Sequence, residues 1–229
     1  MAMTSPQRFA FDALGDALGA SSGLLSCATA ASRINVLMDQ AFEYIGKDGA
    51  GIACRAGCSF CCHLRVMVYP HEAIALFRHL TSRMAEEEAD GVRRRLVANA
   101  ARIGELSREG RVATGLACAF LVEGKCSAYE VRPASCSGYH SLSKQQCEAA
   151  YDNATGAPDR IPVLQALRYV AGEFDAGMDQ ALQVAGLSGT RVELQTAVAA
   201  LIRNPALIQR WRSGRDLLKN HQGTPKGMT

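Results

Sequence analysis

The sequence lacks a long hydrophobic run, a strong net charge and an internal repeat. No stretch approaches the roughly 18 consecutive apolar residues that cross a membrane as a helix. The formal net charge is +3 over 229 residues, which is too small to indicate a nucleic-acid partner by itself. We therefore expect a globular protein with no membrane partner and no partner that is defined by bulk charge.

The N-terminal segment also lacks the unbroken apolar stretch that is typical of a secretory signal peptide. Leu24–Cys27 has the form of a lipoprotein cleavage box, but Asp12 and Asp16 interrupt the apolar stretch that a signal peptide needs. We therefore expect a cytoplasmic protein, in a reducing compartment where clustered cysteines are more often metal ligands or catalytic groups than disulfides.

Helical periodicity occurs on both sides of a cysteine-rich middle. Helices are expected at 34–47, from Pro70 to about Leu80, at 86–106, at 164–182, from a capping box at Thr190–Glu193 to a point before Pro205, and at 206–220. The fold class is therefore mainly α, with helices flanking a cysteine-rich irregular metal module. The expected division is 1–49, an N-terminal helical segment; 50–150, a cysteine-cluster metal-binding domain; and 151–229, a C-terminal helical extension.

The middle segment has little helical periodicity between residues 108 and 150. The sequence AFLVEGKCSAY predicts one small β-hairpin that turns at Glu123-Gly124. A short strand within 64–69 is expected nearby, and 151–162 has the composition of a linker.

Nine cysteines dominate the chemistry of the sequence. The first cluster has the spacing C-x3-C-x2-C-C and contains Cys54, Cys58, Cys61 and Cys62. On a helix these four side chains would share one face, whereas Gly57 favours a loop that enters a helix. Both geometries gather sulfur atoms.

Cys61 and Cys62 are adjacent, so their side chains diverge and do not readily chelate one tetrahedral ion. One of them serves a second ion, bridges two ions or stays unligated. A second set of thiols is present: Cys118, Cys126, Cys136 and Cys147. Together the eight thiols could form two four-cysteine sites, or one iron–sulfur cluster and one zinc site. We expect Cys54, Cys58 and Cys61 to hold the first metal with one later cysteine.

Other interpretations of the thiols stay open. They could be reduced core cysteines, as is expected of Cys27, or Cys61 and Cys62 could form a redox switch. Thiolate ligands suit zinc, iron–sulfur clusters or copper(I), and spacing does not choose among them. The first three cysteines also have the spacing of a radical S-adenosylmethionine enzyme, although the mainly helical pattern that follows does not fit its partial barrel.

Several polar residues flank the cysteines. His63 and His71 are interpreted as surface groups or supports for metal ligands rather than as ligands, and Glu72 as an acid in a first helical turn. Arg132 either offsets the charge of nearby thiolates or pairs with Glu130 at the surface.

The C-terminal segment is basic and contains the single tryptophan, Trp211. A solvated basic face with Trp211 packed into the core is favoured over a nucleic-acid surface. The basic residues are Arg203, Arg210, Arg212, Arg215 and Lys219.

The ordered stretches CRAGCSFCC and CAFLVEGKCSAYEVRPASCSGY resemble the YkgJ-type cysteine-cluster family, described as zinc- or iron-chelating proteins. The similarity covers residues 50–150. It implies that the ligands are Cys54, Cys58, Cys61, Cys62, Cys118, Cys126, Cys136 and Cys147. Many relatives have an arginine after the cysteine that follows Arg-Pro, whereas Ser137-Gly138 stands there in this chain. Some relatives carry the domain within flagellin lysine methylases.

These observations predict a protein that holds zinc or an iron–sulfur cluster, including a four-iron cluster, through the CxxxCxxCC motif and the four later cysteines. The alternative is an iron-dependent redox or protein-modifying enzyme that uses the same cluster. The expected partner is a metal ion, a protein partner is not identified, and nucleic acid is not favoured.

Overall fold

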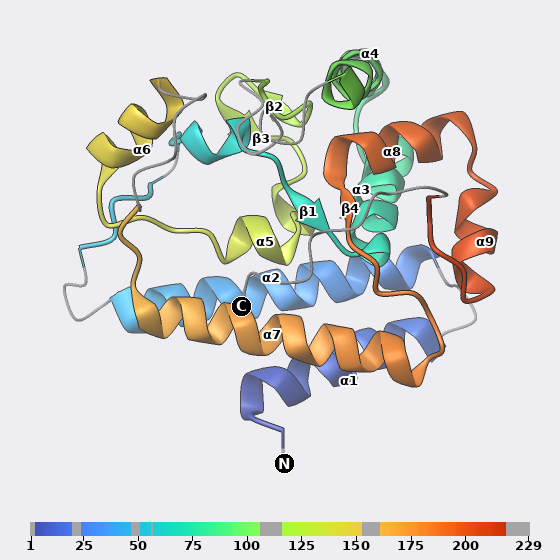
Figure 1. The fold of residues 1–229 in the computed structure, drawn as a ribbon, viewed down its shortest axis with the longest axis horizontal. Coiled ribbons are helices and arrows are strands. Elements are labelled where there is room, and N and C mark those ends of the chain that lie inside the picture. The colour runs from blue at the N-terminus through green and yellow to red at the C-terminus, as the bar shows by residue number, and fades with distance from the viewer. Residues whose placement is uncertain are drawn as a thin grey trace.

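Three long helices form the base of the fold (Figure 1): α1 (Ser5–Gly19), α2 (Leu24–Gly46) and α7 (Gln165–Val184). The computed structural model describes residues 3–19, 24–46, 51–55, 57–105, 116–152 and 161–218. Each of the three helices turns apolar side chains inward, which removes their surface from water and stabilises the layer. The helical segment at 34–47 was predicted, but the helix starts earlier, and α1 was not predicted.

The approach of α1 to α7 depends on a glycine. Gly177 is buried, and a Cβ atom at this position would lie on the carbonyl oxygen of Gln7 and 2.9 Å from the Cβ of Ala10. The neighbouring rings of Phe9 and Phe174 lie 6.4 Å apart in an edge-to-face arrangement. The two helices can therefore meet only where one of them lacks a side chain.

A Gly177→Ala substitution is expected to destabilise the protein by about 2 kcal/mol or more, because the α1 backbone must move away. Gly172→Ala, on the same helix with no atom within 4 Å of the added Cβ, should instead be neutral or stabilise by about 0.5–1 kcal/mol through helix propensity. Urea unfolding of the two variants measures the difference, and equal effects would contradict this packing.

A second group of helices lies above the base, at the right of Figure 1. It comprises α3 (Pro70–Ser82), α4 (Glu86–Glu105), α8 (Leu194–Arg203) and α9 (Leu207–Arg212). Helix α3 packs against both α2 and α8, and α4 packs against α8. Buried residues from all three expected segments form one hydrophobic core, so the described segments are packed together rather than strung out along the chain.

The irregular module extends from the upper left to the centre of Figure 1, where α5 lies above α2. It contains η1 (Phe60–His63), β2 (Leu121–Val122), β3 (Lys125–Cys126), η3 (Tyr129–Val131), α5 (Ala134–Ser137) and α6 (Lys144–Asp152). The hairpin pairs Leu121 with Cys126 in the predicted place. Its turn residues Glu123 and Gly124 both have positive φ, 49° and 75°, as expected of a type I′ turn.

A second small sheet joins segments that are far apart in the sequence. Strand β1 (Met67–Val68) pairs antiparallel with β4 (Val192–Glu193). A strand within 64–69 was predicted, but its partner comes from the C-terminal segment and not from the hairpin. The mainly helical fold class is confirmed, with two two-stranded sheets in the part of the chain that the structure describes.

The start of α8 differs from the predicted capping box. The helix begins at Leu194, and Glu193 itself caps it by accepting hydrogen bonds from the backbone N–H groups of Gln195 (3.1 Å) and Thr196 (2.7 Å). Thr190 lies outside the helix because the chain first pairs as strand β4. Helix α9 is also shorter than the predicted 206–220, since the chain turns after Arg212. Residues 219 and 220 lie outside the described residues.

No helix among the described residues is both long enough and apolar enough to span a membrane.

Candidate metal centre

The first cysteine cluster is a loop followed by a short 3₁₀-helix, so a single helical face does not form. Cys54 and Cys58 precede η1, and Cys61 and Cys62 lie in it. Gly57 supplies the turn with a φ of 84°, which a side chain would disfavour. The interpretation of Gly57 as part of a loop entering a helix is thus the one that the structure shows.

The later cysteines come from three different elements of the module and the segment before its hairpin. Cys118 precedes the hairpin, Cys126 lies in β3, Cys136 in α5 and Cys147 in α6. The backbone N–H of Cys118 donates to the carbonyl of Cys62 at 2.7 Å, which joins the two halves of the sequence pattern. None of the nine cysteines forms a disulfide.

Mutual electrostatic effects divide the cysteines into two sets. In the Cys54 set, the charges of Cys58, Cys61 and Cys147 each raise the pKa of Cys54, although burial of Cys54 is the larger cause. In the Cys136 set, Cys61, Cys118 and Cys126 raise the pKa of Cys136, again after burial. Cys61 is the cysteine that acts on members of both sets.

Burial keeps several of these thiols protonated in the metal-free protein. It raises the pKa of Cys118 to about 12 and that of Cys136 well above its ordinary value. A side-chain hydrogen bond with Cys62, followed by burial, raises the pKa of Cys61 far above the usual range. A thiophilic cation would have to displace these protons, so its binding would release them to solvent.

Backbone N–H groups oppose this effect at three sulfur atoms. Hydrogen bonds from Phe120 and Ala128 lower the pKa values of Cys118 and Cys126, each from two residues further along the chain. A bond from Ser141 acts in the same way on Cys54. Such bonds favour the thiolate over the thiol and orient the sulfur.

Residues 53–154 match the model of the family CxxCxxCC, described as "Putative zinc- or iron-chelating domain". Residues 53–154, which match this family model, are called the CxxCxxCC domain. The predicted resemblance to the YkgJ-type cysteine-cluster family is confirmed by this match. Comparisons with curated proteins and with solved structures found no match.

The side chains of the CxxCxxCC domain that could bind a metal are thiols, which are suitable ligands for zinc or iron. Their sulfur atoms do not surround a common point in the structure. Among the residues it describes, no three Cys, His, Asp or Glu side chains are close enough to hold an ion. A metal ion held by one of these sets would therefore require its sulfur atoms to move closer together.

Arg132 is fixed inside the CxxCxxCC domain. Its guanidinium is buried, pairs with Asp39 of α2 at 2.5 Å and stacks 3.7 Å from the ring centre of Tyr129. The expected alternative, a surface pair with Glu130, is wrong because Asp39 is the partner. Arg132 also lowers the pKa of Cys126, as expected of a cation that offsets thiolate charge.

Glu72 and Gln195 position the cysteine-bearing segments. The buried carboxylate of Glu72 accepts the backbone N–H groups of Tyr69 (2.8 Å) and Ala134 (2.7 Å), so it ties the start of α3 to the helix that carries Cys136. Burial raises the pKa of Glu72 to about 7. The side-chain oxygen of Gln195 accepts the N–H of Ala119 at 2.9 Å.

Sequence analysis placed Glu72 in a first helical turn, where it lies, but missed its link to α5. It did not mark Gln195 at all.

The two histidines near the first cluster have different surroundings. His63 lies in η1 with its ring 4.7 Å from that of Tyr151. His71 is completely buried and stacks on Tyr69 at 5.7 Å. Neither ring nitrogen of His71 has a hydrogen-bond partner among the described residues, and burial lowers its pKa to about 3, with Arg191 as a smaller cause. His71 is therefore neutral in the folded protein.

A His71→Leu variant is expected to be more stable than the parent protein, by a margin that grows in acid. The unfolded parent takes up a proton below its ordinary pKa of 6.5, whereas the folded parent does not until about pH 3. The parent therefore loses stability as the pH falls, by about 2 kcal/mol between pH 6.5 and 5. Urea midpoints of both proteins at pH 7 and pH 5 give the difference, and a margin that does not change with pH would contradict it.

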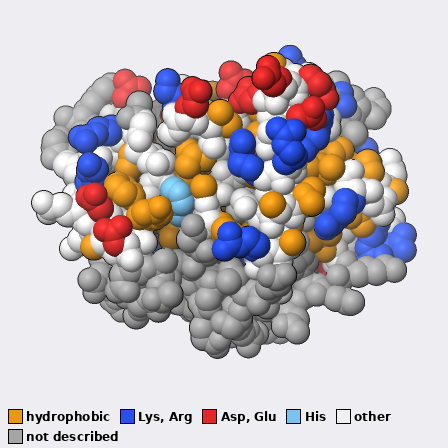
Figure 2. All heavy atoms as spheres, turned by 90° about the horizontal axis from the view of Figure 1, so that it is seen from above, with side chains coloured by type: hydrophobic (Ala, Val, Ile, Leu, Met, Phe, Trp, Pro, Cys, Tyr) orange, Lys and Arg blue, Asp and Glu red, His pale blue; other side chains and the backbone are white. Residues whose placement is uncertain are grey.

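Trp211 is buried in the core, as predicted. Its Nε1–H donates to the carbonyl of Ser188 at 2.9 Å, so the ring is not free to stack on a base. Arg210 and Arg215 each donate from Nε to atoms of their own segment, and Lys219 lies outside the described residues. Figure 2 shows basic side chains interspersed with hydrophobic ones on the face seen from above, with most acidic side chains along the upper edge and a smaller group at the left. That the basic C-terminal segment does not bind nucleic acid stays a prediction.

Proposed function

We propose that the chain binds two zinc or iron ions through the CxxCxxCC domain, with the thiolate of Cys61 bridging them. The first ion is held by Cys54, Cys58, Cys61 and Cys147. The second is held by Cys61, Cys118, Cys126 and Cys136. The proposal is supported by the way the fold gathers the two groups of later cysteines around η1, which carries Cys61: helix α6 packs against η1, and the backbone N–H of Cys118 donates to the carbonyl of Cys62 at 2.7 Å. The electrostatic effect of Cys61 on cysteines of both sets agrees with this arrangement.

The adjacent Cys62 takes a different role in this arrangement. Its side chain hydrogen bonds with Cys61, and its carbonyl accepts the N–H of Cys118. Adjacent side chains diverge, so Cys62 does not share the bridging position. It supports the bridging sulfur and fixes the loop that carries Cys118.

Two ions per chain are expected when the protein is purified without oxygen and its metal is measured. Cys58→Ser removes one ligand of the first site only, so it should lower the metal content by about half. Thiolate-to-iron charge transfer colours an iron–sulfur protein, whereas zinc leaves it colourless, and an absorption spectrum of the same sample identifies the metal. A protein that contains neither zinc nor iron would contradict the proposal.

A second candidate function, an iron-dependent redox or protein-modifying enzyme, is favoured by one feature. A cavity lies directly beside Cys58, and an enzyme needs an open coordination position or a substrate pocket next to its metal. A coloured protein that bleaches reversibly with dithionite would support this candidate, and a colourless zinc protein would remove it.

A further inference from the structure

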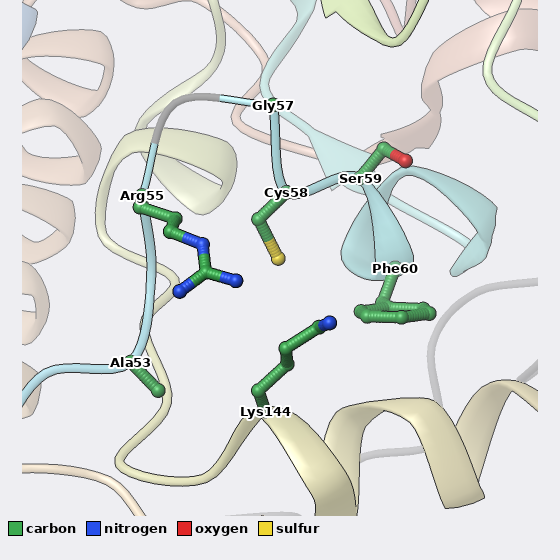
Figure 3. A pocket seen from close by; sticks show the side chains of 7 residues that line it. All are labelled: Ala53, Arg55, Gly57, Cys58, Ser59, Phe60 and Lys144. Atoms are coloured by element: carbon green, nitrogen blue, oxygen red, sulfur yellow. The ribbon is translucent and has the colours of Figure 1, made fainter.

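The cavity beside Cys58 has a distinct chemical character (Figure 3). Its volume is about 240 Å³, and it is lined by Ala53, Arg55, Gly57, Cys58, Ser59, Phe60 and Lys144. Two cations from separate parts of the chain point into it: the guanidinium of Arg55 from the loop and the amino group of Lys144 from the first residue of α6. The sulfur of Cys58 points into the same space.

No acidic side chain lines this cavity. Neither Arg55 nor Lys144 forms an ion pair with a residue that the structure describes. The start of α6 adds the positive partial charge of a helix N-terminus. The cavity therefore combines two uncompensated cations with hydrogen-bond donors, which is the environment that an oxyanion requires.

One alternative is that the two cations serve to neutralise the thiolates. Four thiolates around a divalent ion leave a net charge of −2, which two cations could offset. Both cationic groups, however, point into the open space of the cavity, where a small anion could contact them together. The metal content of variants at these two positions separates the alternatives.

The size and charge of the cavity restrict its occupant. Its volume is below the roughly 300–1,000 Å³ of pockets for drug-sized ligands, so the ligand is small. The two cations repel a hydrated metal cation, and Phe60 is the only large apolar side chain in the lining. A small oxyanion fits the small volume, the positive charge and the mainly polar lining of the cavity.

We propose that this cavity binds a small oxyanion, a carboxylate or a phosphate, between Arg55 and Lys144 and directly beside the metal-bound sulfur of Cys58. The second half of this statement rests on the proposed metal site. Arg55 supplies a planar fork for two parallel hydrogen bonds, and Lys144 supplies a point charge. The bound oxyanion would then hold a small substrate or co-ligand next to the first metal site.

Calorimetric titration of the metal-loaded protein with succinate and with inorganic phosphate tests the proposal and separates the two sources of oxyanion. Saturable binding of at least one is expected, and the neutral diamide of succinate should not bind. The double variant Arg55→Gln/Lys144→Gln should lose at least tenfold in affinity with its metal content unchanged. Lys125→Gln, an exposed cation on the hairpin, is the matched control and should bind like the parent.

Three results would overturn the inference. The first is that neither anion binds saturably to the metal-loaded parent. The second is that the double variant binds the anion as tightly as the parent does. The third is that the double variant loses metal while the parent binds no anion, which would mean that the two cations compensate the thiolate charge. Metal content is measured on every sample. A parent protein that binds anion but holds no zinc or iron would therefore refute the proposed function and leave the anion cavity standing.

Discussion

A Cys61→Ser variant is expected to lose both metal ions, whereas Cys147→Ser loses one. The reason is the proposed role of Cys61 as a ligand in both sites, with Cys54 in one and with Cys118, Cys126 and Cys136 in the other. A serine hydroxyl is a poor ligand for zinc or iron at neutral pH, since these sites bind thiolate. Metal analysis after anaerobic purification gives the two stoichiometries directly.

Two further variants make this test specific. Cys62→Ser keeps the sulfur of Cys61 and should retain both ions. Cys27→Ala removes the buried thiol of α2 and should also retain both, at a small cost in stability. If Cys61→Ser lost only one ion, or if Cys62→Ser lost one as well, two separate four-cysteine sites would replace the bridged arrangement.

Removal of the metal is expected to open the CxxCxxCC domain while the three-helix base stays folded. Structural zinc contributes on the order of 10 kcal/mol of binding free energy to small domains at neutral pH, and the module consists of short elements that bury little apolar surface of their own. The base is held by apolar packing that contains no candidate ligand. Hydrogen exchange after treatment with a chelator should thus show loss of protection at 57–64 and 116–147, and retained protection in α1, α2 and α7.

The same experiment on Cys27→Ala gives the matched control, because its metal sites are intact and its base is altered. Its exchange pattern should respond to the chelator as the parent does. Simultaneous loss of protection in the base and in the module would contradict a separable metal-dependent unit.

The helices that sequence analysis predicted are those whose apolar faces repeat over several turns. Helices α3, α4 and α7 lie where periodicity placed them, and the hairpin turn was indicated by Glu123-Gly124. Helix α1 was missed. Its glycines weaken its helical propensity, and its buried residues, such as Leu14, are stabilised by packing on α7, which no local pattern reveals.

The eight candidate ligands stay a prediction from the sequence, in which clustered thiols are a strong local signal. The proposed division into two sets could not be predicted, since Cys147 acts on Cys54 only because α6 folds against η1. The contacts that position the cysteine-bearing segments could not be predicted from the sequence either. Gln195 lies on an amphipathic helix and resembles a surface amide, because its hydrogen bond with Ala119 joins residues that are distant in the sequence.

The pairing of β1 with β4 has a consequence for the order in which the protein is made. Every cysteine precedes residue 148, whereas Val192, Glu193 and Gln195, which fasten Met67, Val68 and Ala119, come later in the chain. Synthesis proceeds from the N-terminus, and contacts this distant in sequence form only when both partners exist. The growing polypeptide on the ribosome thus contains all of its cysteines before strand β4, which pairs with β1 beside the cysteine-bearing segments, has been synthesised.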